Sequence, residues 1–493
     1  MRLIFGGAFL WRIFAINQSF WLDEAISANV AKMSFSQILT QFAPTDFHPP
    51  LYYLLIKVWS ICFTNSEISL RLFSTFAILI GGYFVYLAAN RLRGGWGEWA
   101  AIFFLFNPLL VYYSHEARMY GLNVMFLAMT TYFWLNLYLH RLKQTPTNIS
   151  PNQPQARHFF HQCQIRLQTI FNNLPTHPHL PDSSDLLWFN VCAALSIMTF
   201  YGSVFYLAAL IIITMSVHKW QSCLKLIFGP VFAIVILTPL LLLQMEHASK
   251  MTALVPNWKS VLGLANGKNL FLLLLKMTSG RISFDPKIVY VFLASLWALF
   301  VAWIAIINWR RSQLFWGIIL TVVSLSFVAS SVVPMFSYFR LLYLVIPLAL
   351  ILSEESRVYF REVLLVFFLI WGGVYLFSPH QHRENWRSLA KSITQNEEIL
   401  MVQSASDPMK YYLPDAKIID FKLIDTIDKK QEKIVVIPYV VDIHAIEYRQ
   451  ALTQKGFQLE SEKSFHLLKK ETWSKITKNK INPNSIPPKY RKL

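Results

Sequence analysis

The sequence predicts a mostly α-helical protein that crosses a membrane several times and carries a small α/β domain near its C-terminal end. Of the 493 residues, 55% are hydrophobic, and they gather in runs close to the twenty residues that span a hydrocarbon core. After residue 378, short β-branched runs replace the long apolar ones. We therefore expect a membrane domain over 1–378, an α/β domain over 379–471, and a disordered basic tail over 472–493.

The apolar runs predict about eleven transmembrane helices. Basic residues cluster on alternate connectors, which the positive-inside rule assigns to the cytoplasm, so the N-terminus is expected inside and the C-terminal domain outside. The expected spans lie near residues 2–16, 69–89, 97–113, 119–139, 185–200, 202–217, 224–244, 288–307, 313–333, 339–353 and 361–377.

Two long polar segments interrupt these runs. Residues 17–67 form the first outer loop, in which Pro49 and Pro50 are expected in the first turn of a surface helix. Residues 140–184 are rich in Pro, Asn, Gln and His, which predicts a disordered cytoplasmic insert. In the C-terminal domain, Ile399–Val402, Lys417–Asp420 and Lys433–Ile437 are expected to be strands, and 387–396 and 443–455 helices.

The net charge is +18. In a membrane protein, basic cytoplasmic connectors and a basic tail account for such an excess, because anionic lipid attracts Lys and Arg. Membrane lipids are therefore expected partners, and nucleic acid is not. The four cysteines show no paired spacing, so no disulfide framework is expected.

The first candidate for chemistry is the acidic pair Asp23 and Glu24, which follows the first apolar run. A carboxylate at a membrane face can take the proton of an acceptor hydroxyl held within hydrogen-bonding distance. Because adjacent side chains point in different directions, we expect Asp23 to be the base and Glu24 to support it by pairing with an arginine or binding a cation. The alternative is a pair of solvated loop charges.

The second candidate is His48, which precedes the two prolines of the first loop. A neutral imidazole ligates a divalent cation, and a protonated one contacts phosphate. The alternative is a helix-start residue with a hydrogen bond to the backbone. No HExxH spacing occurs, and no HxxH spacing includes His48, so no tightly held zinc is expected at this segment.

The third candidate is the outer turn that holds His115, Glu116, Arg118 and Tyr120. Charges at a membrane boundary are costly unless they are paired or liganded, so a functional role is the default expectation. A guanidinium at Arg118 can bind a phosphate with two parallel hydrogen bonds. The alternative is an internal ion pair of Arg118 with Glu116 or Asp23.

The remaining candidates are basic or aromatic residues expected on the same outer side. Arg340 begins a span, where it contacts phosphate or extends its charge to the interface. Arg383 and Arg387 follow the last span and line an entrance or form a collar that binds headgroups, and Tyr201 lies at an outer turn.

Taken together, these segments resemble a known superfamily. Leu22-Asp23-Glu24-Ala25, His48-Pro-Pro-Leu-Tyr-Tyr53, Ser114-His-Glu-Ala-Arg118-Met-Tyr-Gly121, Tyr338-Phe-Arg340 and Glu384-Asn-Trp386-Arg387 are similar to segments of bacterial GT-C glycosyltransferases. The most similar group contains protein O-mannosyltransferases and aminoarabinose lipid A transferases. The likeness extends over most of 1–390, although Tyr338-Phe-Arg340 departs from the more usual Arg-Tyr-Leu order.

The resemblance implies a GT-C-like fold and an inverting transfer of a sugar from a polyprenyl phosphate donor, on the outer face of a bacterial plasma membrane. It places the base at Asp23 and phosphate-facing groups at His48, Arg118 and Arg340. A divalent cation near Glu24 or His48 stays open, and so does the acceptor: protein, lipid or polysaccharide.

Two other functions remain open. One is a flippase that moves a lipid-linked saccharide without catalysis, against which the polar groups gather at one face and no inverted repeat is visible. The other is a ligase of the same fold class that uses a pyrophosphate-linked glycan.

Overall fold

A computed structural model describes residues 1–144, 183–217, 220–254, 263–394, 397–427 and 431–475. The described chain forms two compact units. The first comprises residues 1–18, 30–254 and 263–382, and the second comprises residues 19–29 and 383–475. A short piece of the first loop thus joins the C-terminal domain.

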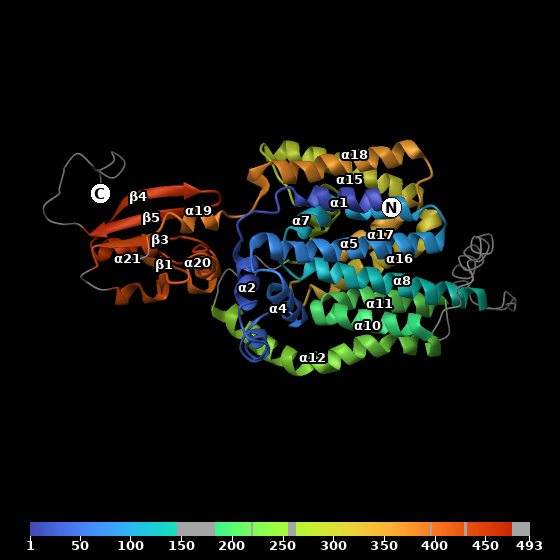
Figure 1. Ribbon diagram of the computed structural model, residues 1–493, viewed down its shortest axis with the longest axis horizontal. Coiled ribbons are helices and arrows are strands. Elements are labelled where there is room, and N and C mark those ends of the chain that lie inside the picture. Colours follow the sequence, from blue (N-terminus) through green and yellow to red (C-terminus); the bar gives the residue numbers. More distant parts are fainter. Residues whose placement is uncertain (145–182, 218–219, 255–262, 395–396, 428–430, 476–493) are drawn as a thin grey trace. The chain divides into compact units, whose positions relative to one another are not determined.

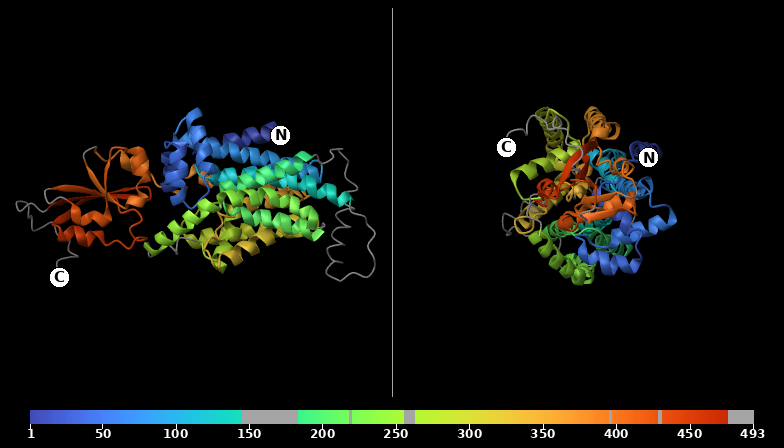
Figure 2. Two further views of the ribbon diagram at one scale, coloured as in Figure 1. Left: turned by 90° about the horizontal axis from the view of Figure 1, so that it is seen from below. Right: turned by 90° about the vertical axis from the view of Figure 1, so that its left-hand side faces the viewer.

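The first unit is a bundle whose long helices run side by side (Figures 1 and 2). Its short helical turns are η1 (Ile38–Phe42), η2 (Ala43–Thr45), η3 (Leu342–Leu344) and η4 (Pro379–Gln381). Its helices are α1 (Arg2–Ile13), α3 (Phe35–Gln37), α4 (Leu51–Cys62), α5 (Glu67–Leu92), α6 (Gly97–Leu105), α7 (Pro108–Ser114), α8 (Tyr120–Gln144), α10 (Ser183–Thr199), α11 (Ser203–Val217), α12 (Trp220–Leu254), α14 (Gly267–Ser279), α15 (Lys287–Ile307), α16 (Trp309–Ala329), α17 (Val345–Ser353) and α18 (Val358–Phe377).

Every expected span falls on one or two of these helices. Among the described residues, six helices (α5, α8, α12, α15, α16 and α18) combine the length and the apolar composition needed to cross a membrane. The protein is therefore a polytopic membrane protein, and the count of about eleven crossings stays a prediction.

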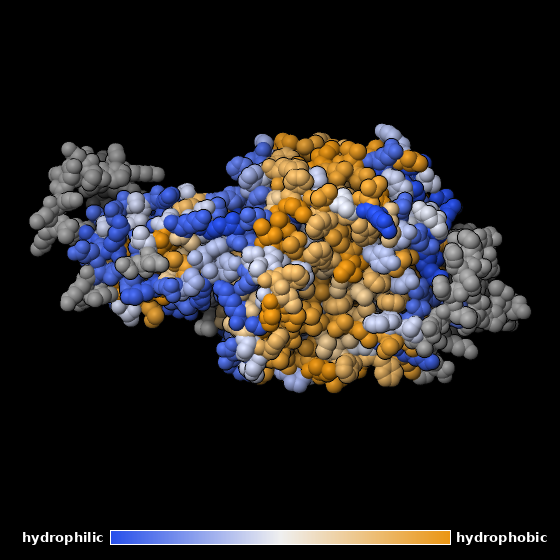
Figure 3. Space-filling view, in the orientation of Figure 1, coloured by the Kyte–Doolittle hydropathy of each residue, from blue (hydrophilic) through white to orange (hydrophobic). Residues whose placement is uncertain are grey.

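The outer surface of the helices is apolar. Figure 3 shows a broad hydrophobic band across this unit, with hydrophilic residues at its edges. On α15, Ile288, Phe292, Leu299 and Ile306 are exposed. In water such a surface would drive aggregation, so it is the face that meets lipid.

The run expected to span 97–113 is broken into α6 and α7. The Asn107 side chain caps α7 by accepting hydrogen bonds from the backbone N–H of Leu109 (3.0 Å) and Leu110 (3.3 Å). Pro108 follows in the first turn, where its missing N–H costs nothing. The Asn107 amide also donates to the carbonyl of Met277 (2.9 Å), which fixes α14 against α7.

The expected helix of the first loop is present as α4, and its position along the membrane surface stays a prediction. Pro50 is its N-cap, so the two prolines precede the first turn instead of occupying it. The Tyr52 and Tyr53 side chains are buried against the rest of the unit.

The second unit is built on a five-stranded sheet of order β2-β1-β3-β5-β4. The first three strands in this order pair in parallel, and β5 pairs antiparallel with both β3 and β4. Its elements are α2 (Leu22–Val30), α19 (Trp386–Ala390), β1 (Glu398–Met401), η5 (Gln403–Ala405), α20 (Asp407–Tyr412), β2 (Lys417–Asp420), η6 (Phe421–Thr426), β3 (Lys433–Val436), α21 (Tyr448–Gln454), β4 (Phe457–Phe465) and β5 (Leu468–Lys475).

Helices cover both faces of this sheet. Leu400 and Val436 pack with Leu452 of α21 on one face. Ile399 and Val435 pack with α19 and α20 on the other face. Alternate residues of each strand therefore enter different cores, which explains why these strands are apolar throughout.

The three expected strands are present as β1, β2 and β3, and the two expected helices are present as α19 and α21. The hairpin β4–β5 was not predicted, because Glu and Lys alternate with its few apolar residues. β5 extends to Lys475, so residues 472–475 belong to the sheet and not to the expected tail; residues 476–493 lie outside the described chain. Of the insert expected over 140–184, residues 140–144 belong to α8 and residues 183 and 184 to α10, and residues 145–182 lie outside the described chain.

Candidate functional site

The predicted site residues fall into both units, and each unit is described by itself. In the first unit they gather on the loops and helix ends around α7, α8 and α11. In the second unit they lie on α2 and on the segment that leads into α19.

Asp46 and His48 form the first group of the helical unit. The His48 Nδ1 and Asp46 Oδ2 atoms lie 3.6 Å apart, and both side chains are largely buried. Burial raises the pKa of Asp46, but attraction to His48 and Arg118 outweighs burial and lowers this pKa to about 2. Asp46 is therefore an anion at any physiological pH, with cationic and imidazole groups facing it.

Arg118 and Tyr201 complete this group. The Arg118 guanidinium donates to the Tyr53 hydroxyl (3.1 Å). Tyr201 donates to Oε1 of Gln244 (2.7 Å), whose amide nitrogen donates to the carbonyl of His48 (3.0 Å). The turns that carry Arg118 and Tyr201, together with helix α12, are thus held around the His-Pro-Pro segment.

Glu116 and Arg281 form the second group. The Arg281 Nη1 and Glu116 Oε1 atoms are 3.5 Å apart, and the guanidinium lies 5.2 Å from the centroid of the Tyr112 ring. The backbone carbonyl of Glu116 accepts from the Ser74 hydroxyl (2.7 Å). Glu116 thus forms an internal ion pair with Arg281, a partner that was not among the alternatives drawn from the sequence.

The backbone positions Arg281 through Gly280, the C-cap of α14. Gly280 has φ +77°, a conformation that favours glycine, and a Cβ there would lie 2.9 Å from Cβ of Pro108. This tight turn directs the chain from α14 back toward α7, where Tyr112 and the Glu116 turn lie.

Aromatic rings connect the two groups. Tyr120 contacts Phe200 (6.2 Å between centroids) and Phe339 (5.9 Å), and Phe200 stacks on His48 (6.2 Å). The Arg340 guanidinium lies 5.7 Å from the Phe339 ring and donates to the carbonyl of Pro334 (3.1 Å). His48, Glu116, Arg118, Tyr120, Tyr201 and Arg340 therefore belong to one neighbourhood.

His115 is placed differently. Its Nε2–H donates to the carbonyl of Arg12 (2.5 Å), and its Nδ1 accepts from the Tyr375 hydroxyl (3.3 Å). The side chain is buried and is held on both ring nitrogens by α1 and α18. This arrangement is that of a structural histidine, so the substrate-binding role expected from the sequence gains no support from its contacts.

In the second unit, Glu24 lies at the start of α2. Its Oε2 accepts from the backbone N–H of Trp21 (3.5 Å), which is one half of a capping box. Asp23 lies in the first turn of the same helix, where the helix dipole stabilises a negative charge.

Arg383 and Glu384 accompany this acidic pair. The Arg383 guanidinium lies 3.7 Å from the centroid of the Trp21 ring. The Tyr439 hydroxyl donates to Oε1 of Glu384 (3.2 Å). Burial raises the pKa of Tyr439, and the charges of Glu384 and Asp23 raise it further, so this phenol stays neutral at alkaline pH.

Arg387 lies in α19, and its backbone N–H donates to the Ser19 hydroxyl (3.0 Å). Neighbouring contacts tie the rest of residues 19–29 to the domain: the Phe20 N–H donates to the Tyr412 hydroxyl (2.8 Å), and the Asn29 amide donates to the carbonyl of Asp407 (3.0 Å).

Three further residues of these groups were not among the predicted site residues. Asp46 is two residues before His48, a spacing that could have marked it. Arg281 lies 165 residues away from its partner Glu116, so spacing along the chain does not link the two. Tyr439 left no recognisable signal.

No group of three or more His, Cys, Asp or Glu side chains is arranged to hold a metal within the described part of the chain. The divalent cation expected near Glu24 or His48 stays a prediction: His48 has Asp46 as a carboxylate neighbour, and Glu24 already serves as a helix cap.

A family model described as dolichyl-phosphate-mannose-protein mannosyltransferase matches residues 47–145. The match covers less than half of the chain, and it contains His48, Glu116 and Arg118. No curated protein matches the sequence.

Two solved structures show weak likeness. One is ArnT from Cupriavidus metallidurans bound to undecaprenyl phosphate, at 12% identity and a TM-score of 0.49, over 97% of this chain and 98% of that chain. The other is the oligosaccharyltransferase of Archaeoglobus fulgidus, at 10% identity and a TM-score of 0.45, over 85% of this chain and 64% of that chain.

Proposed function

We propose that this protein is a GT-C-type membrane glycosyltransferase that transfers a sugar from a polyprenyl phosphate donor, with inversion, to an acceptor hydroxyl on the outer face of a bacterial plasma membrane. One observation carries the proposal. The segment matched by the mannosyltransferase model supplies His48, Glu116 and Arg118, and the fold adds Arg281 and Arg340, which lie far outside that segment.

This neighbourhood suits a phosphate group. Arg118, Arg281 and Arg340 are guanidinium groups on loops and helix ends, and Asp46 and Glu116 partly balance their charge. As the bond to the carrier breaks, negative charge grows on the phosphate, and preset cationic donors stabilise it by several kcal/mol. Arg118 is the residue proposed to contact that phosphate, because it lies in the segment matched by the mannosyltransferase model, and its guanidinium donates to Tyr53 (3.1 Å) beside the His48 loop.

The reaction balances without a further reactant. The acceptor oxygen attacks the anomeric carbon, the bond from that carbon to the phosphate oxygen breaks, and polyprenyl phosphate leaves. Asp23 takes the proton of the acceptor hydroxyl. This role for Asp23 rests on the family resemblance and on its place in the first turn of α2.

The test uses purified full-length protein in detergent or nanodiscs with a radiolabelled polyprenyl phosphate sugar and a membrane extract as acceptor source. We expect release of polyprenyl phosphate. Asp23→Asn lowers release by about 10²- to 10⁴-fold, the range for loss of a general base, and Arg118→Gln lowers it by about 10²-fold or more.

Asp425→Asn is the matched control, because that carboxylate is 90% exposed in η6. It is expected to release carrier at the wild-type rate. Movement of the donor across a vesicle bilayer without release of carrier would refute the enzyme and support the flippase.

A further inference from the structure

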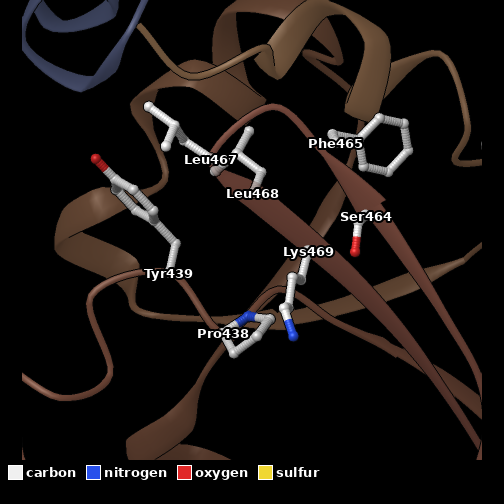
Figure 4. Close-up of a pocket in the computed structure, with 7 residues that line it drawn as sticks. All are labelled: Pro438, Tyr439, Ser464, Phe465, Leu467, Leu468 and Lys469. Atoms are coloured by element: carbon white, nitrogen blue, oxygen red, sulfur yellow. The ribbon is translucent and has the colours of Figure 1, made fainter. Parts of the chain in front are cut away.

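The second unit contains a cavity that the predicted reaction does not use. It lies between the segment after β3 and the β4–β5 hairpin, and its volume is about 320 Å³. Tyr439, Ser464, Leu468 and Lys469 are among its lining residues (Figure 4). This volume is at the lower end of the range of small-molecule pockets.

The lining combines apolar and polar side chains. The Tyr439 ring, Pro438 and Leu468 supply flat or aliphatic surface, while Ser464 and Lys469 supply a hydroxyl and an ammonium group (Figure 4). A saccharide ring has the same two characters, because its C–H faces pack on aromatic and aliphatic surface and its hydroxyl rim requires hydrogen-bonding partners.

A second cavity of about 310 Å³ continues the first, since Pro438 and Lys469 line both. Its further lining includes the charged residues Asp442, Glu447 and Arg449. The two cavities together favour a ligand longer than one ring and polar along its length, which a saccharide chain satisfies and an acyl chain does not.

One residue that lines the first cavity also lies near Asp23 and Glu384. This residue is Tyr439, whose hydroxyl donates to Glu384 (3.2 Å). The charge of Asp23 contributes to raising the pKa of the Tyr439 phenol, so the two side chains lie in the same region. The Trp386 ring holds the Tyr439 ring edge-on at 5.0 Å. The backbone N–H of Asn385 donates to the carbonyl of His466 (3.1 Å), so the hairpin turn is fixed to the same segment.

We propose that this double cavity binds a saccharide portion of the acceptor, with the Tyr439 ring as the wall between the bound sugar and the surroundings of Asp23. The inference rests on the proposed function, because it names the class of acceptor for that reaction. It restricts the acceptor to a polysaccharide or a glycan-bearing molecule.

The test measures binding of full-length detergent-solubilised protein to an array of defined oligosaccharides, with a peptide array and anionic lipid vesicles in parallel. Ser464→Trp fills the first cavity from β4. Gln458→Trp, on the same strand but outside the lining, is the matched control. We expect oligosaccharide binding by wild type, Asp23→Asn and Gln458→Trp, and at least a tenfold loss in Ser464→Trp.

Carrier release separates this inference from the proposed function. Ser464→Trp is expected to raise the KM for the acceptor with the KM for the donor unchanged. No oligosaccharide binding by wild type, equal binding by Ser464→Trp, or cavity-dependent binding of peptides or vesicles instead would overturn the inference. If wild-type protein binds oligosaccharide but releases no carrier, the proposed function fails while the cavity assignment stands.

Discussion

Asp46 provides the sharpest test of the cluster in the helical unit. Its pKa is lowered from 3.8 to about 2 in the folded protein, and each unit of pKa corresponds to 1.36 kcal/mol. The ionised carboxylate therefore stabilises the fold by about 2 kcal/mol at neutral pH. Asp46→Asn keeps the size of the side chain and removes that charge, so it is expected to cost about the same amount.

The dependence on pH has a definite sign. A carboxyl group with a depressed folded pKa contributes its full stability above its unfolded pKa and loses it as the pH falls through the folded pKa. The difference between wild type and Asp46→Asn should therefore be constant between pH 5 and pH 8. It should fall to roughly half at pH 3, where the unfolded chain but not the folded one is protonated.

The assay is thermal unfolding of purified protein in detergent across this pH range. For a unit of this size, about 2 kcal/mol corresponds to a shift of roughly 3 °C in Tm. Glu246→Gln is the matched control, because its ion pair with Lys250 is exposed and contributes little. A Tm for Asp46→Asn equal to that of the control at pH 7, or a difference that grows as pH falls, would refute the reasoning.

Three further substitutions test other parts of the structure. Glu471 is fully buried and accepts from the Trp473 indole (2.9 Å), so Glu471→Ala should destabilise the C-terminal domain by about 3 kcal/mol in denaturant unfolding; Glu471→Gln retains an acceptor and should cost less than half as much. Glu355 is buried and accepts two hydrogen bonds from the Arg357 guanidinium (2.7 Å each) and one from its backbone N–H (3.0 Å). Because Arg357 is half exposed and rehydrates, Glu355→Ala should cost only about 1–3 kcal/mol by thermal shift, and a larger loss would contradict this. Gly280→Ala places a Cβ against Pro108 at a positive φ and should destabilise the protein by about 1–3 kcal/mol. It should also reduce carrier release, which is the functional measurement. Unchanged release and an unchanged Tm would contradict the role assigned to this turn in positioning Arg281.

Much of the fold could be predicted because it depends on local pattern. Runs such as 69–89 and 288–307 are long and apolar, so they became α5 and α15 with nearly the expected ends. The β-branched runs near 399 and 434 became β1 and β3 for the same reason. The hairpin β4–β5 was not predictable, because β4 is mostly exposed and polar, and it is a strand by virtue of its backbone pairing with β5 and not of its own composition.

The candidate site could be predicted only in part. The motifs around His48 and Arg118 are local, and the sequence singled them out. The pairing of Glu116 with Arg281 is not local, since packing of α14 against α7 brings the two together. The burial of His115 against α1 and α18 likewise depends on which helices become neighbours.

By itself, the sequence determined the membrane class, the positions of the long helices and a short list of candidate charged residues, because hydrophobic length and charge act along the chain. Only the tertiary structure decided that residues 19–29 join the C-terminal domain, that Asp46 faces His48 and Arg118, and that Tyr439 borders both a cavity and the acidic pair. These are contacts between segments far apart in sequence, and they follow from how side-chain surfaces pack once the helices and strands have formed.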